Sequence, residues 1–166
     1  MNRTRTTVIA LVAATVLGLL LTGSPASANH PYSRARIGDA AGQTWATANS
    51  TNNLVTMRTL SSSSAQVWAF SDASVGVRVR NLANGHCLAP PRTWSGTSPP
   101  VHHLACAGRP AEQWQLVATS SSTWAFRNVG IQGRCMAVNR NYSPPRLFLV
   151  PCNYGALNQQ FRLRRY

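Results

Sequence analysis

Three copies of one unit lie along this sequence, and the repeat limits the fold more than any other feature. Residues 55–60, followed by Trp68, align without a gap with residues 101–106, followed by Trp114, 46 positions later. A third copy places Phe161 47 positions beyond Trp114. A fixed period of this length indicates one supersecondary unit whose copies bury their apolar faces against one another. The predicted units span about residues 33–76, 77–123 and 124–166.

Each unit consists of short segments in which apolar and polar residues alternate. Residues 75–80 show this pattern, and clusters of Asn, Gly, Ser and Pro separate such segments. Alternation with a period of two predicts half-buried strands joined by turns, and few segments beyond residue 28 have a helical period. We therefore expect an all-β domain in which three units close on a shared core. Trp68, Trp114 and Phe161 are predicted to pack at its centre as core side chains.

Residues 1–28 have the pattern of a removable secretory signal peptide. Arg3 and Arg5 precede an apolar run at 8–21, and small residues follow at 26–28. The run is shorter than the roughly 20 residues that a membrane span needs. We expect a secreted, extracellular protein without a membrane span, whose mature domain covers residues 29–166.

Four cysteines, which export allows to form disulfides, could pair in three ways. They lie at equivalent places in units two and three, so the repeat predicts the pairs Cys87–Cys106 and Cys135–Cys152. Their wide spacing does not fit the closely spaced ligand pairs of structural zinc sites. We expect no metal and no cofactor.

The charge of the chain argues against catalysis and in favour of anionic partners. All 16 basic residues are Arg, and Asp39, Asp72 and Glu112 are the whole set of carboxylates. Three acids are too few for most paired-carboxylate, calcium or two-metal sites, and no nucleophile-elbow motif accompanies them. A strongly positive chain attracts polyanions, although charge by itself does not define a specific nucleic-acid site.

Three triplets and the cysteine pairs resemble the ricin-type (ricin B-like) lectin β-trefoil. The triplets are Gln66-Val67-Trp68, Glu112-Gln113-Trp114 and Gln159-Gln160-Phe161. The resemblance extends from about residue 33 to 166. It implies a barrel of β-hairpins, a cap made of three hairpins, and up to one shallow sugar pocket in each unit.

The resemblance also implies where the pocket residues should lie, and most of them have been replaced. In that family a pocket uses an Asp two residues after the first Cys, an aromatic residue two before the second, and the Asn of an Asn-Gln pair. The Asp positions here hold Ala46, Ala89 and Ala137, and the aromatic positions hold Arg58, Leu104 and Val150. Unit three keeps the amide pair as Asn158 and Gln159. We therefore expect degenerate pockets, with unit three as the best remaining site.

Other side chains could replace the missing contacts. Trp94 lies in the loop of unit two, His103 precedes Cys106, and Asn139 and Tyr142 lie in the matching loop of unit three. An aromatic ring beside an amide can stack against a sugar and bond its hydroxyls. The alternative is that Trp94 and Tyr142 are partly buried loop anchors and that His103 is structural.

The leading functional prediction is a secreted, monomeric, non-catalytic module that binds a glycan. In the alternative, arginines such as Arg140 and Arg146 bind an anionic cell-surface polymer. A protein partner is a further alternative, including a protease that docks on the loop at 90–100.

Overall fold

The computed structural model describes residues 31–166, so the predicted signal peptide at 1–28 lies outside the described residues. The regular secondary structure of this part of the chain is almost entirely β-strand, and it contains no helix that is long and apolar enough to cross a membrane. The strands are β1 (Arg34–Asp39), β2 (Trp45–Ala48), β3 (Val55–Arg58), β4 (Trp68–Asp72), β5 (Val77–Asn81), β6 (Cys87–Ala89), β7 (His102–Leu104), β8 (Gln113–Ala118), β9 (Trp124–Asn128), β10 (Arg134–Asn139), β11 (Arg146–Pro151) and β12 (Phe161–Arg165). Three single-turn 3-10 helices are η1 (Ser64–Gln66), η2 (Pro110–Glu112) and η3 (Leu157–Gln159).

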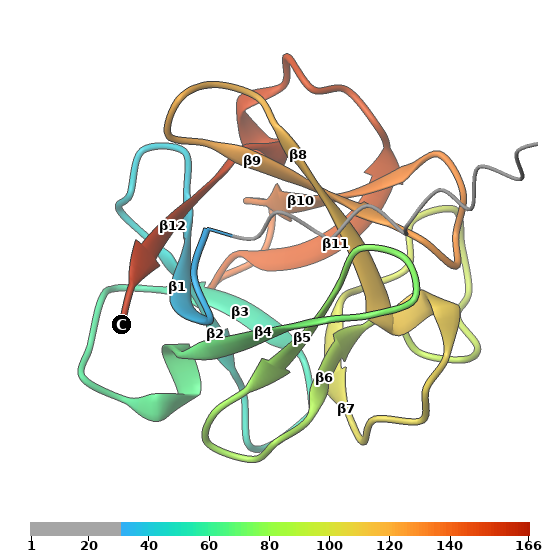
Figure 1. Ribbon diagram of the computed structural model, residues 1–166, viewed down its shortest axis with the longest axis horizontal. Helices are drawn as coiled ribbons and strands as arrows, with labels where there is room; N and C mark the ends of the chain where they lie inside the picture. The colour runs from blue at the N-terminus through green and yellow to red at the C-terminus, as the bar shows by residue number, and fades with distance from the viewer. Residues whose placement is uncertain (1–30) are drawn as a thin grey trace, which may run out of the picture.

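Six strands form a closed antiparallel barrel (Figure 1). Around the ring, β1 pairs with β4, β4 with β5, β5 with β8, β8 with β9, and β9 with β12. The first and last strands then close the ring, in a register that runs from Ala35↔Arg165 to Asp39↔Phe161. Closure pairs the edge strands that an open sheet would expose.

The other six strands form three hairpins, β2–β3, β6–β7 and β10–β11. Single-residue pairings join them to one another: Arg146 to Thr56, Leu54 to His102, and Pro100 to Phe148. Each run of four strands repeats the same pairing scheme. A closed six-stranded barrel with a triplet of hairpins is a β-trefoil, which confirms the predicted fold class.

The shared core contains the three repeated aromatic residues. Trp68, Trp114 and Phe161 are completely buried. Phe126 links two of them, with ring centroids 6.3 Å from Trp114 and 5.6 Å from Phe161, both edge to face. Each indole N–H donates to a carbonyl, from Trp68 to Ala46 at 3.0 Å and from Trp114 to Leu88 at 2.8 Å.

The first residue of each triplet holds the loop that leads to the core aromatic. The Gln66 amide accepts from Ser61 N at 2.8 Å and donates to Thr59 O at 2.7 Å. Gln159 makes the same two bonds, with Asn153 N and Pro151 O. In unit two, the buried Glu112 carboxylate accepts from the amides of Ala107 and Gly108 and from Arg109 Nε. The triplets therefore recur because these buried polar side chains form the hydrogen bonds that the main-chain groups of each loop need.

Both disulfides predicted from the repeat are present. Cys87–Cys106 and Cys135–Cys152 have Cα separations of 5.1 and 4.9 Å, and no cysteine of residues 31–166 is free. Each closes a short loop, which constrains the unfolded chain by roughly 3 kcal/mol in the chain-entropy model.

The predicted pocket positions set Ala46 equivalent to Ala89 and Ala137, and so Thr44 equivalent to Cys87; this alignment is wrong by one residue at the β1–β2 turn. Asp39 N donates to Thr44 O, and at the equivalent place Asn81 N donates to His86 O. Thr44 therefore corresponds to His86 and not to Cys87. The physical reason is that the two turns differ in length. In unit one the glycine with positive φ, Gly42, comes three residues after Asp39, whereas in unit two Gly85 comes four residues after Asn81.

Trp45 takes the place that Cys87 and Cys135 hold in the other units. It packs on Gly38 so closely that a Cβ at position 38 would lie 2.9 Å from Trp45 Cζ3. In unit one, the buried Trp45 indole packed against the Gly38 backbone thus takes the place of the disulfide that units two and three have. Thr47, and not Ala46, then matches Ala89 and Ala137.

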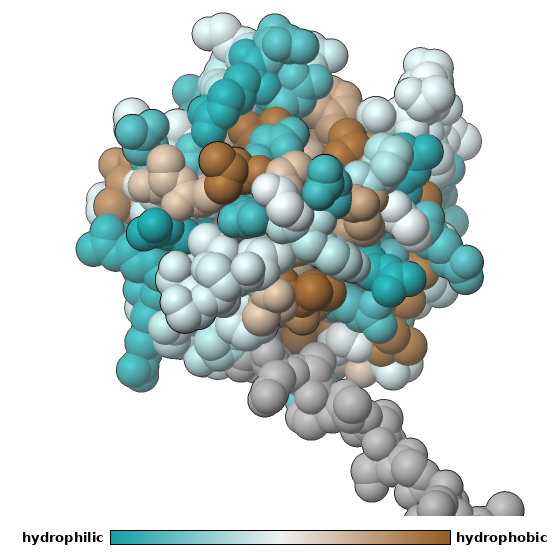
Figure 2. All heavy atoms as spheres, turned by 90° about the horizontal axis from the view of Figure 1, so that it is seen from above, coloured by the Kyte–Doolittle hydropathy of each residue, from teal (hydrophilic) through white to brown (hydrophobic). Residues whose placement is uncertain are grey.

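The surface on the face shown in Figure 2 is mostly hydrophilic, with hydrophobic residues in small separate groups. Monomeric proteins rarely expose a large contiguous apolar patch.

Replacing a central aromatic residue should strongly destabilise the fold. We expect Trp114→Ala to lower the free energy of unfolding by about 3 to 5 kcal/mol, because it leaves a large cavity and an unpaired Leu88 carbonyl. Trp94→Ala, at an exposed loop position, should cost less than about 1 kcal/mol. Urea unfolding of both variants provides the measurement, and an equal loss in both would contradict the assignment of the core.

Acid should weaken the protein through Glu112. Burial raises the pKa of this carboxyl, but the hydrogen bonds from Arg109 and the loop amides outweigh burial and leave the pKa below its ordinary value of 4.5. The ionised form is therefore favoured in the folded state, so its stabilisation is complete above pH 4.5 and is lost as the pH falls through the lower folded value. In Glu112→Gln, matching Gln66 and Gln159, thermal unfolding between pH 6 and 3 should show a smaller acid loss than in the wild type.

Candidate ligand pocket in unit three

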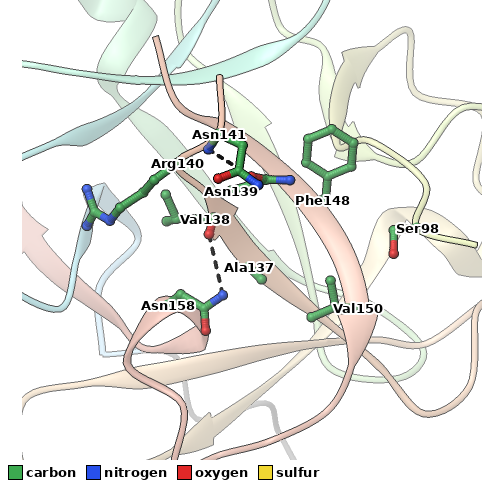
Figure 3. A pocket seen from close by; sticks show the side chains of 9 residues that line it. All are labelled: Ser98, Ala137, Val138, Asn139, Arg140, Asn141, Phe148, Val150 and Asn158. Carbon is green, nitrogen blue, oxygen red and sulfur yellow. Dashed lines mark hydrogen bonds between the residues drawn. The ribbon is translucent and has the colours of Figure 1, made fainter. Parts of the chain in front are cut away.

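A shallow hollow of about 370 Å³ opens in unit three (Figure 3). Strand β10 and its following turn, strand β11, and η3 supply most of the lining, and one residue comes from the loop of unit two. The lining residues are Ser98, Ala137, Val138, Asn139, Arg140, Asn141, Phe148, Val150 and Asn158. The volume is within the usual range for small-molecule sites, and no carboxylate is among these residues.

One wall of the hollow is apolar. Ala137 pairs directly with Phe148 across the β10–β11 ladder, so the two side chains share a face, and Val150 follows on the same face. Phe148 stacks on Tyr142 with ring centroids 5.4 Å apart and an interplanar angle of 21°. The Arg146 guanidinium lies over the Tyr142 ring, with its Cζ 4.5 Å from the ring centroid.

Phe148 is the lining residue that the sequence analysis missed. The family pattern places an aromatic residue two before Cys152, where this chain has Val150, and the predicted substitute was Tyr142 in the loop. The alternation of β11 could have identified Phe148, because it lies two residues from Val150 and therefore on the same side of the strand.

Amide side chains lie at the edge of the hollow. Asn158 is exposed and donates through Nδ2 to Val138 O at 3.4 Å, which holds η3 against β10. Asn139 is half-buried, and its Oδ1 accepts from Asn141 N at 3.0 Å. Asn139 and Asn158 thus line one hollow, whereas Tyr142 does not line it and stacks on Phe148.

Arg140 is tied to unit one by an ion pair. Its Nη2 lies 2.9 Å from Asp39 Oδ2, and Asp39 also accepts from Gln43 N and from Thr44. Burial raises the pKa of Asp39, but these hydrogen bonds together lower it below its ordinary value. Arg146, stacked on Tyr142, is half-buried. Arg140 is therefore exposed, as the alternative prediction assumed, although it is paired with Asp39, whereas Arg146 is not fully exposed.

Gln159 and His103 serve the fold. Gln159 is buried and uses both amide atoms on the main chain, as described above. His103 is 2% exposed, with Nε2 2.9 Å from Asn49 O and Nδ1 3.1 Å from Asn84 Nδ2. This corrects their assignment as ligand contacts, since burial leaves neither side chain a group that can reach a ligand.

Trp94 is 42% exposed on the loop between β6 and β7 and does not line the hollow. Residues 31–166 contain no group of three or more His, Cys, Asp or Glu side chains that could hold a metal ion.

Comparison with known proteins identifies a family for most of the chain. A family model described as the ricin-type beta-trefoil lectin domain matches residues 38–161. Comparison with curated proteins finds no match.

Solved structures share the fold at low sequence identity. The designed threefold-symmetric protein ThreeFoil has a TM-score of 0.68 and 17% identity, over 80% of this chain and 98% of ThreeFoil. A ricin B-like lectin of Macrolepiota procera in complex with lactose has a TM-score of 0.66 and 12% identity, over 80% and 95%. An exo-β-1,3-galactanase from Clostridium thermocellum has a TM-score of 0.70 and 14% identity, over 80% of this chain but 30% of the enzyme.

Mild acid should also affect the protein through His103. Burial lowers the pKa of His103 below 6.5, and the nearby His86 adds to this effect, whereas the bond to the Asn49 carbonyl opposes it. The neutral form is favoured in the folded state, so stability is complete above pH 6.5 and falls as the pH drops below that value. Unfolding measurements between pH 7.5 and 5.5 should show this fall, and His103→Gln should flatten it. If the unfolding free energy of His103→Gln fell with pH as steeply as that of the wild type, His103 would not be the group responsible.

Proposed function

The chain belongs to the ricin-type beta-trefoil lectin domain family, and we propose that it is a secreted, monomeric, non-catalytic module that binds a carbohydrate in the hollow of unit three. The observation that carries this proposal is the meeting of an apolar wall, Phe148 and Val150, with the amides of Asn139 and Asn158. An apolar sugar face can lie against such a wall while its hydroxyl groups bond to the amides.

The affinity of this site should be low, because Ala137 lies where the family pattern has an Asp. Without an acceptor there, a ligand hydroxyl that loses its water stays unpaired, at a cost of about 1 to 3 kcal/mol. Galactosides are the first ligands to test, since the Macrolepiota lectin was solved with lactose.

We expect one weak site rather than three. In unit two, Ala89 is fully buried and pairs with His102, whose imidazole is smaller and more polar than the phenyl ring of Phe148. In unit one, Thr47 pairs with Thr56. Neither hairpin offers the apolar wall found in unit three.

Removing the Asn158 amide should abolish neutral-sugar binding with little effect on folding. Asn158 is exposed and makes one long hydrogen bond, so Asn158→Ala should lower the free energy of unfolding by less than about 1 kcal/mol. Calorimetry with lactose should detect binding to the wild type and none to Asn158→Ala. Restoring a carboxylate with Ala137→Asp should tighten binding by about 10-fold, equivalent to one good hydrogen bond to a charged group.

The control is Gln132→Ala, which removes an exposed amide of unit three that does not line the hollow and should leave lactose binding unchanged. Binding that persists in Asn158→Ala, or that does not respond to Ala137→Asp, would place the sugar elsewhere. Absence of lactose binding to every variant would reject a galactoside ligand.

A further inference from the structure

Five arginines gather where the two ends of the barrel sheet meet. Strands β1 and β12 lie side by side at this seam (Figure 1). The arginines are Arg34, Arg36, Arg162, Arg164 and Arg165, and we call them the arginine seam. The first two are separated from the other three by more than 120 positions in the sequence, so only barrel closure brings them together.

The register of the seam places one pair of like charges directly opposite each other. Arg36 pairs with Arg164, and Arg162 pairs with Gly38, one step further along the same face. The intervening residues Ala35 and Ile37 are completely buried, so Arg34 and Arg36 alternate with them and face outward. Arg165 pairs with Ala35 and therefore lies on the other side of the ladder, where it is exposed at the end of β12. Like charges directly opposite on a sheet are destabilising. The fold therefore maintains an unfavourable arrangement at this place.

Two adjoining hollows lie along the seam and share Tyr32 and Arg165. One, of about 390 Å³, is lined also by Arg34 and Tyr166. The other, of about 510 Å³, is lined also by Arg162 and Arg164. Four of the five seam arginines therefore line one or both hollows, together with tyrosine side chains, and Arg36 lines neither.

The exposed donors of the seam belong to Arg34, Arg162, Arg164 and Arg165, whereas Nε of Arg36 is buried. Arg36 donates to Ser61 O at 3.3 Å and lies 4.8 Å from the Tyr166 centroid, and Arg162 Nε donates to Ala40 O at 2.6 Å. These partners are neutral, so they do not balance the charge. Asp39 and Glu112 make their ion pairs with Arg140 and Arg109, outside the seam.

We propose that the arginine seam is a second binding site, separate from the sugar hollow, for a linear polymer of phosphate groups. Guanidinium groups bind phosphate through two parallel hydrogen bonds. Outward residues of one strand repeat about every 6.8 Å and neighbouring strands lie about 4.8 Å apart, so an extended polyanion meets several of them at once. Binding neutralises the opposed charges and releases counterions, as for other phosphate polymers.

Two charge-matched variants test the proposal. The seam variant combines Arg34→Gln, Arg164→Gln and Arg165→Gln, and the control variant combines Arg80→Gln, Arg92→Gln and Arg127→Gln at exposed positions elsewhere. The probe is inorganic polyphosphate, titrated at several salt concentrations. We expect the affinity of the seam variant to fall at least 10-fold. The slope of log affinity against log salt concentration should become less negative by about two to three. The control should lose less than threefold.

An independent measurement concerns stability without a ligand. If the opposed arginines repel one another, Arg164→Gln should raise the melting temperature at low salt, and added salt should reduce the gain. Polyphosphate should in turn stabilise the wild type against heat but not the seam variant.

Equal losses in both triple variants would overturn the proposal, because they would show attraction to net charge alone. Tighter, seam-dependent binding of single-stranded DNA or heparin than of polyphosphate would overturn the choice of polymer. Asn158→Ala should bind polyphosphate like the wild type, and the seam variant should bind lactose like the wild type. These two results separate a failure of the seam from a failure of the sugar site.

Discussion

The pairing of β1 with β12 is the constraint on which the rest of the structure depends. Five consecutive residue pairs join the first strand to the last and close the barrel. Closure surrounds Trp68, Trp114 and Phe161 with strands on all sides, so each aromatic side chain is completely buried. The three hairpins lie outside this ring of strands, so their turns and strand lengths can differ between units without opening the barrel.

The two proposed sites follow from this division. The sugar hollow lies on a hairpin of the triplet, where Ala137, Phe148 and Asn158 come from three elements held together by the Gln159 bonds and by Cys135–Cys152. The arginine seam lies on the barrel, where the fold itself brings like charges together. A neutral ligand at the first site and an anionic one at the second could bind at once, since the two linings share no residue.

Sequence reasoning succeeded where a residue's role repeats in every unit. The alternating strands, the buried aromatics and the cysteine pairs recur at a fixed period, so each copy supports the interpretation of the others. It failed at the β1–β2 turn, because a shift of one residue in the position of Gly42 moves Trp45 to the place of a cysteine. Unit one has no disulfide, so the sequence contains no marker that reveals the shift.

The sequence by itself determined the repeat, the all-β class, the cysteine pairs and the loss of the usual pocket acids, because these depend on local pattern and spacing. Tertiary structure alone decided which polar residues remain available to a ligand. His103 is inside because Asn49 of unit one reaches it, and Phe148 lines the hollow because the ladder sets it opposite Ala137. The arginine seam likewise depends on barrel closure, a contact between distant ends of the chain that no local period encodes.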